Sequence, residues 1–370
     1  MSDAKDFSKP EITVQKTEHI KGIAIILLMW HHLFGVEYLK DWFAFLPGVD
    51  YVIGAAGNMC ISIFLFCSGY GLYKSYIGKE NTPKTYIFHR LVKTLIPYWI
   101  VMAATIIYLV FAGKFELKYL PVNLLALIHS DSVLYVSFSW FIKLYVLIIL
   151  VLPLIKLIEK RFRKNALIDM LIYIVAPFAL AVVFAKHLNE STFVNIPSFI
   201  ASTIVFLLAW FPPFAAGILF AKYNTYQKIR KFTDRFPRYL TIAISLLLLG
   251  NLFFLRFIVG NIFIETIIYE CCMEDVILAP VFVVLCLLVI DSVKHHSRYV
   301  LPFLGRKSVY YWLLSGLFFL NTLELSFLIT WPVYTLFILI WTFVLLTPFV
   351  FACDWLGSKL IGLICGKRSS

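Results

Sequence analysis

The sequence has little charge for its length: only 15% of its 370 residues are charged, whereas 61% are hydrophobic. This composition excludes an ordinary soluble domain, which needs a larger polar surface. Negative charge is the scarcer sign, with 21 acidic residues against 33 basic ones and a formal net charge of +12. The basic residues lie in short clusters between apolar runs, a pattern typical of membrane topology. It predicts no nucleic-acid partner.

Paired cysteines and metal-ligand spacings are also missing. The seven cysteines are scattered, with Cys271 and Cys272 as the only neighbours, and there is no CxxC. Adjacent cysteines rarely bridge, so we expect neither a disulfide framework nor a metal site. The sequence also lacks an A-x-A cleavage site before its first apolar run, and it lacks GxSxG. We therefore expect no cleaved signal peptide and no serine-esterase mechanism.

What the sequence does contain is a series of apolar stretches long enough to cross a bilayer as helices. With both termini inside, most of the 33 Lys and Arg fall on the cytoplasmic side, as the positive-inside rule requires. We therefore predict an all-α integral membrane protein of about ten transmembrane helices with both termini cytoplasmic. The ten predicted spans are 19–37, 50–77, 92–113, 140–158, 166–185, 198–221, 238–258, 272–291, 304–322 and 330–356.

The domain organisation that follows is simple, because the sequence has no internal repeat, low-complexity segment or soluble appendage. We predict a cytoplasmic tail over 1–18, one membrane domain over 19–358 and a second cytoplasmic tail over 359–370. Membrane lipid is then an obligatory partner. The predicted location is the cell membrane, and specifically a bacterial plasma membrane crossed several times.

The first predicted helix carries ionisable side chains that do not belong in hydrocarbon by default. It begins with Lys21 and ends near the adjacent pair His31 and His32. Eleven residues of α-helix place Lys21 and His32 within about 20° of one face, with a rise of about 16 Å. This geometry favours His32 as the reactive histidine, because His31 points about 100° away. The alternative for Lys21 is an ordinary flanking cation that extends to the headgroups.

Two later segments hold further candidates for a site. Arg90 and Lys93 lie one helical turn apart, so both present their charge on one face, where they suit a phosphate group. An ordinary role as flanking cations remains the alternative. Ser68 lies in a stretch with Gly69 and Gly71, where small residues commonly allow close helix packing. A binding role for the Ser68 hydroxyl is the second explanation of that stretch.

Six segments in order along the chain form a larger pattern. The first joins a cation to a histidine with ten residues between them, and the others combine small, aromatic, basic and proline residues. The six segments are KGIAIILLMWHH at 21–32, FLFCSGYGLY at 64–73, HRLVKTLIPYW at 89–99, WFIKLYVLIILVLPL at 140–154, FPPFAAGILF at 211–220 and LGRKSVYYWLL at 304–314. Taken together and in this order, they resemble the signatures of the membrane acyltransferase 3 family.

The resemblance implies an enzyme that moves acetyl or another short acyl group from cytosolic acyl-CoA to a hydroxyl. The acceptor would be a cell-envelope polysaccharide or a lipid-linked glycan precursor, and no metal would be involved. His32 would be catalytic, with His31 as the neighbour that duplicates it. Lys21, Arg90 and Lys93 would hold the donor, and Ser68 is a further candidate for that role.

Two alternatives come from other functional classes. A multi-spanning transporter or lipid-linked sugar carrier would use His31 and His32 in a proton or substrate path. We find no inverted repeat that favours it. A non-catalytic membrane sensor is the other alternative, although the sequence shows no soluble module to receive a signal. Binding of coenzyme A distinguishes the enzyme from both.

Overall fold

The computed structural model divides the chain into two compact units, which we describe separately. Unit 1 comprises residues 1–28, 52–80 and 153–306, and unit 2 comprises 29–51, 81–152 and 307–370. Cys271 and Cys272, residues 1–10 of the predicted N-terminal tail and residues 367–370 of the C-terminal tail lie outside the described residues. The structure describes residues 11–35, 48–126, 135–136, 139–161, 165–189, 198–262, 274–293, 299–319, 328–329, 331 and 334–366.

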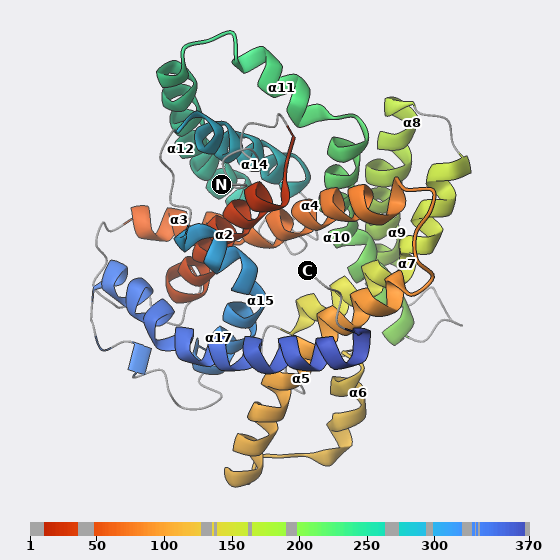
Figure 1. Ribbon diagram of the computed structural model, residues 1–370, viewed down its shortest axis with the longest axis vertical. Helices are drawn as coiled ribbons and strands as arrows, with labels where there is room; N and C mark the ends of the chain where they lie inside the picture. The colour runs from red at the N-terminus through yellow and green to blue at the C-terminus, as the bar shows by residue number, and fades with distance from the viewer. Residues whose placement is uncertain are drawn as a thin grey trace. The chain divides into compact units, whose positions relative to one another are not determined.

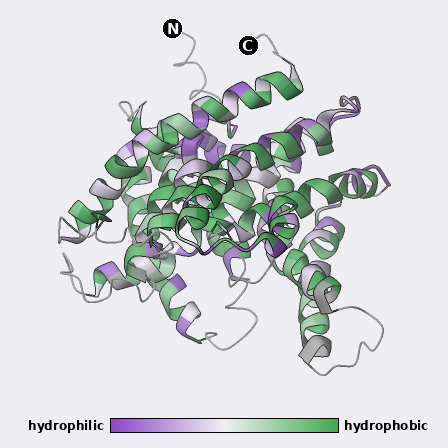
Figure 2. Cartoon of the chain, turned by 90° about the horizontal axis from the view of Figure 1, so that it is seen from below, coloured by the Kyte–Doolittle hydropathy of each residue, from purple (hydrophilic) through white to green (hydrophobic). Residues whose placement is uncertain are grey.

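Every regular element in these ranges is a helix, and hydrophobic residues cover most of the helices (Figures 1 and 2). This confirms the prediction of an all-α integral membrane protein. Of the described helices, eight are long and apolar enough to cross a membrane. They cover 52–77, 86–111, 140–161, 166–185, 202–222, 238–262, 275–292 and 335–365.

Two of the ten predicted spans, 19–37 and 304–322, fall on helices outside that set of eight. They correspond to α2 (Val14–Trp30) and α15 (Val300–Phe319). Both helices carry charged residues in their first half, which lowers their mean hydropathy. The number ten and the cytoplasmic termini therefore stay predictions.

Unit 1 is built around the contact between α4 (Cys60–Leu72) and α10 (Ser198–Lys222). Glycine permits this approach: a Cβ on Gly69 would overlap the carbonyl oxygen of Phe214, and one on Gly217 would overlap that of Phe66. A Cβ on Gly71 would meet nothing. The packing role predicted for the small residues of this stretch therefore holds for Gly69 and not for Gly71.

The other helices of unit 1 surround this pair (Figure 1). α9 and α14 pack on α10, and α12 packs on α14. Between α10 and α12 the chain forms a shorter helix, α11. Their bounds are α8 Ala166–Met170, a π-helix Leu171–Val175, α9 Ala176–Asn189, α11 Thr225–Thr233, α12 Arg238–Ile262, α14 Asp275–Ser292 and, after α4, a π-helix Tyr73–Ile77.

A buried charge cluster joins the ends of three elements of unit 1. Lys222, at the end of α10, is 2.8 Å from a carboxylate oxygen of Glu159 and 2.7 Å from one of Asp169. The hydroxyls of Tyr73 and Tyr223 donate to Glu159 and Asp169 respectively. The side chain of Lys222 is 1% exposed, so the two carboxylates supply the polar partners that its burial requires.

A second buried cluster joins α12 to the start of α14. Arg256 lies within α12 with its side chain 2% exposed, and its guanidinium is 2.9 Å from Glu274 and 2.8 Å from Asp275. Burial raises the pKa of the Glu274 carboxyl, although the Arg256 charge opposes that shift. The pairing explains how an arginine is accommodated inside a helix that is otherwise apolar.

Unit 2 contains the contact between α5 (Tyr86–Phe111) and α17 (Thr335–Cys365). α17 is much longer than the roughly 20 residues that cross a bilayer, and it continues to Cys365. Gly357 lets α17 approach its neighbours, because a Cβ there would overlap the hydroxyl of Tyr310. The remaining elements of unit 2 are a 3-10 helix Leu117–Tyr119 and α6 Leu120–Leu124. Two further helices, α3 Val49–Gly57 and α7 Trp140–Arg161, have residues in both units.

Candidate active site

The histidine pair stands where the first helix changes its geometry. α2 ends at Trp30, and the chain continues as a π-helix over His31–Gly35. The rings of His31 and His32 lie 5.5 Å apart between centroids, tilted by 46°, and both side chains are partly buried. The indole of Trp30 donates to the carbonyl oxygen of Asp50 at 3.1 Å, and this fixes the last α-helical turn.

The π-helix changes the relation predicted between Lys21 and His32. The angle of about 20° assumes 3.6 residues per turn throughout, whereas a π turn closes its hydrogen bonds one residue later and is wider. Only the last two of the eleven residues from Lys21 to His32 lie in the π-helix, so the shared helix face stays a prediction. π-helical turns are rare in proteins, and many of those that occur lie at functional sites.

Lys21 and Ser68 belong to unit 1, whereas His31 and His32 belong to unit 2. Lys21 is partly buried in α2 and lies close enough to Cys67 for its charge to act on that thiol. Cys67 directly precedes Ser68 in α4, and Ser68 is itself partly buried. The two candidates from unit 1 therefore lie in the same neighbourhood.

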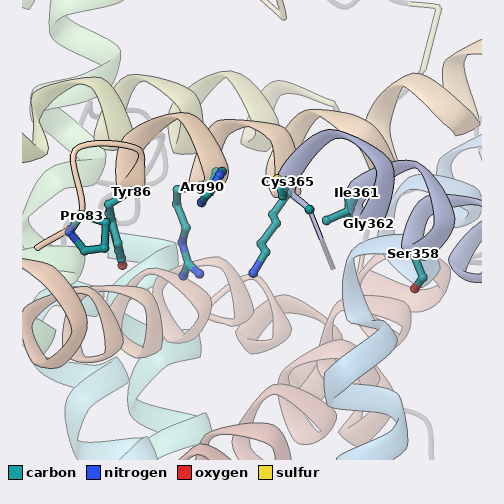
Figure 3. Close-up of a pocket in the computed structure, with 10 residues that line it drawn as sticks. Pro83, Tyr86, Arg90, Ser358, Ile361, Gly362 and Cys365 are labelled. Atoms are coloured by element: carbon teal, nitrogen blue, oxygen red, sulfur yellow. The ribbon is translucent and has the colours of Figure 1, made fainter. Parts of the chain in front are cut away.

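Arg90 and Lys93, which the sequence places on one helix face, both line a single cavity in unit 2. The cavity has a volume of about 430 Å³ and opens between the start of α5 and the end of α17. In Figure 3 the side chains of Tyr86 and Arg90 project from α5 to the same side. The lining residues are Pro83, Tyr86, His89, Arg90, Lys93, Ser358, Ile361, Gly362, Cys365 and Gly366. We call this cavity the basic pocket.

The guanidinium of Arg90 is oriented by a column of three aromatic rings, those of Tyr145, Phe141 and Trp312. It donates a hydrogen bond to the hydroxyl of Tyr145 at 3.2 Å. The ring of Tyr145 stacks on Phe141, with centroids 6.2 Å apart, and Phe141 stacks on Trp312 at 4.5 Å. Because both ring contacts are nearly parallel, the column fixes the Tyr145 hydroxyl and with it the direction of Arg90.

Part of the hydrogen-bonding capacity of Arg90 is unused. Its Nε is buried and has no hydrogen-bond partner among the described residues. Lys93 differs from Arg90, because its side chain is exposed and free to follow a ligand. The pocket thus combines one oriented guanidinium with one mobile ammonium, an arrangement suited to a group that carries several negative oxygens.

The wall opposite α5 is formed by residues that sequence reasoning did not single out. Ser358 and Gly362 of α17 present small side chains to the basic pocket. They also line a second cavity of about 830 Å³, in which Trp355 and Lys359 are prominent. Sequence reasoning also missed Tyr86 and His89, although His89 directly precedes Arg90 in the segment HRLVKTLIPYW.

Within the ranges given above, no three His, Cys, Asp or Glu side chains are grouped so that they could hold a metal ion. The cysteines described in these ranges, Cys60, Cys67, Cys286, Cys353 and Cys365, are free thiols.

Comparison with known proteins gives one match. A family model described as an acyltransferase domain, that of acyltransferase family 3, matches residues 16–355, nearly the whole chain. No curated protein and no solved structure matches. The matched range includes the histidine pair and the α5 side of the basic pocket, and it ends before Ser358. The match favours an enzyme over the transporter and sensor alternatives. The chain belongs to the acyltransferase 3 family and is a multi-pass membrane acyltransferase.

Proposed function

We propose that the acyl donor of this enzyme is acyl-CoA, most simply acetyl-CoA, and that its phosphates bind in the basic pocket. The observation that carries the proposal is the oriented Arg90 beside the mobile Lys93 in one cavity. A volume of about 430 Å³ is within the range of about 300–1,000 Å³ that small-molecule sites occupy. Arginine supplies directed contacts to phosphate oxygens, and lysine supplies a point charge.

The acceptor in this proposal is a hydroxyl of a cell-envelope polysaccharide or of a lipid-linked glycan precursor, and the reaction is O-acylation at a bacterial plasma membrane. His32 acts as general base: it takes the proton of the hydroxyl as the oxygen attacks the thioester carbonyl. The carbon–sulfur bond then breaks, and coenzyme A leaves as a thiol after receiving that proton. His31 is the alternative base. Lys21 and Ser68 stay candidates for donor binding on the strength of the sequence alone.

Binding of acetyl-CoA to the purified full chain tests the donor assignment, with the apparent Kd measured by titration calorimetry in detergent. We expect Arg90→Gln to weaken binding about tenfold or more, since a hydrogen bond to a charged group contributes about 1.5–3 kcal/mol. Lys79→Gln is the matched control, because Lys79 is an exposed cation outside the pocket. Equal affinity of the Arg90 variant and the wild type would reject this pocket as the donor site.

A second arm uses the other wall of the pocket. Gly362→Leu adds bulk to α17 at a position where a new Cβ meets no atom within 4 Å, so the fold should accept the first carbon. Gly362 lines both the basic pocket and the second cavity, so the rest of the leucine side chain would take up space at the α17 wall that the two cavities share. We expect weaker donor binding without loss of thermal stability. Unchanged binding in this variant would also count against the proposal.

A further inference from the structure

α11 is a short amphipathic helix with features that the acyl-transfer proposal does not use. It runs from Thr225 to Thr233, between the spanning helices α10 and α12 (Figure 1). The segment from Thr225 to Arg238 contains five basic residues and a single acid, Asp234. Such a concentration of positive charge places this connection on the cytoplasmic side by the positive-inside rule.

The rotation of α11 about its axis is fixed by Tyr226. This side chain is 1% exposed, and its hydroxyl donates to a carboxylate oxygen of Asp291 at 2.7 Å. Asp291 also forms an ion pair at 2.8 Å with Lys16, which is fully buried. One face of α11 is therefore held against the ends of α2 and α14, all within unit 1. The opposite face is fixed outward as a consequence.

That outward face is both basic and aromatic. Lys228 and Lys231 lie about 160° and 140° around the helix from Tyr226, and Phe232 lies about 120° from it. All three are exposed, Phe232 to 57%. The surface continues past the helix through Arg235 and Phe236, and the rings of Phe232 and Phe236 pack edge to face at 5.4 Å.

The charge of this surface is not neutralised from within. Asp234, the only acid of the segment, forms an ion pair with Arg230 at 3.0 Å. It is therefore not paired with the cations of the outward face. Among the described residues, no ion pair involves Lys228, Lys231 or Arg235. The surface thus has two exposed aromatic rings beside three cations that no acid neutralises. Helices that lie in the membrane interface have this composition.

Covalent geometry determines what can reach this surface. α11 begins three residues after α10 ends, and α12 begins at Arg238, five residues after α11 ends. Nine helical residues extend over about 13 Å, so the helix cannot move far from the ends of the two spans. The nearest large source of negative charge is therefore the phospholipid headgroup layer of the cytoplasmic leaflet.

We propose that the outward face of α11, formed by Lys228, Lys231, Phe232, Arg235 and Phe236, binds anionic phospholipid headgroups selectively. The three cations contact the phosphate groups, and the two phenylalanine rings insert at the boundary of the acyl chains. The acyl chains of zwitterionic lipids can contact the phenylalanine rings equally well. Their headgroups, however, carry no net negative charge to attract the three cations. The surface thus distinguishes phosphatidylglycerol from phosphatidylcholine.

The test is retention of added lipid by the purified full chain, measured by native mass spectrometry in a neutral detergent. We expect the wild type to retain phosphatidylglycerol in several-fold preference to phosphatidylcholine. The triple variant Lys228→Gln, Lys231→Gln and Arg235→Gln should lose most of that preference. The matched control, Lys79→Gln with Lys84→Gln and Lys160→Gln, removes three exposed cations from other connections of the chain and should keep it.

Three outcomes would overturn the proposal. The first is equal retention of the two lipids by the wild type, and the second is an unchanged preference in the α11 variant. The third is an equal loss in the control, which would reduce the effect to net charge. A measurement on the wild type alone guards against a folding defect in the variants. Its preference for phosphatidylglycerol must fall as the salt concentration rises, because exposed charges are screened.

Discussion

The guanidinium of Arg90 reaches the basic pocket in a direction set by the hydroxyl of Tyr145, which accepts its hydrogen bond at 3.2 Å. Tyr145 in turn rests on Phe141 and, through it, on Trp312. None of these three aromatic residues lines the pocket. They can affect a bound ligand only through the orientation of Arg90. Their role is therefore to position Arg90, not to contact the ligand.

Tyr145→Phe keeps the ring stack and removes only the hydroxyl that positions Arg90. We expect the apparent KM for acetyl-CoA to rise up to about tenfold, because the lost hydrogen bond is worth about 1–1.5 kcal/mol. The kcat should change little. Steady-state kinetics of the reconstituted enzyme checks the split, and a fall in kcat with an unchanged KM would contradict the positioning role.

His32→Ala should lower kcat by about 100- to 10,000-fold, since a positioned general base contributes that much to a proton transfer. Donor binding by calorimetry should be unaffected, because the basic pocket is built from α5 and α17 and the variant leaves both intact. His31→Ala is the matched comparison, as its ring is 5.5 Å away in the same π-helix. The assignment is wrong if His31→Ala abolishes transfer and His32→Ala retains it.

Gly69→Ala should destabilise the protein by about 1–3 kcal/mol or more, because the added methyl meets the backbone of α10, which cannot move aside easily. Gly71→Ala, two residues later in the same helix, provides the control. Its methyl group meets nothing, so the substitution should be neutral or stabilising by up to about 1 kcal/mol. Thermal unfolding in one detergent compares the two, and an equal shift would show that α4 and α10 are not in close contact there.

Lys222→Met should cost about 3–5 kcal/mol, because it leaves Glu159 and Asp169 buried without their cation. Lys307→Met breaks a more exposed pair with Asp354, whose side chains are 21% and 26% exposed, and should cost about 1 kcal/mol or less. Midpoints of chemical or thermal unfolding give the comparison. A small effect for Lys222 would mean that water reaches the cluster.

The sequence was sufficient for those parts of the fold that depend on local hydropathy. The ten predicted spans all overlap helical residues, and eight of them overlap helices long and apolar enough to cross a membrane. The other two overlap α2 and α15, which are not apolar enough to count as spans by composition alone. The spacing of Arg90 and Lys93 predicts that both lie on one helix face, and both line the basic pocket. That inference needed only the geometry of a single helix.

Features that depend on distant residues could not be derived in this way. The π-helix at His31 follows no proline or glycine signal, so the sequence did not predict this change of helix type. Lys222 and Glu159 are 63 residues apart, and nothing in either neighbourhood indicates the other. The α17 wall of the basic pocket is still farther from Arg90 along the chain. Only tertiary packing brings such residues together.

The α17 wall also determines when during biosynthesis the basic pocket is complete. Arg90 emerges early in translation and is inserted with the second of the eight long apolar helices, whereas Ile361 and Gly362 come from the last of them. A nascent chain that has not yet inserted α17 has only one half of the cavity. Under the proposal that this cavity holds the acyl donor, the completed chain is the first species able to bind that donor.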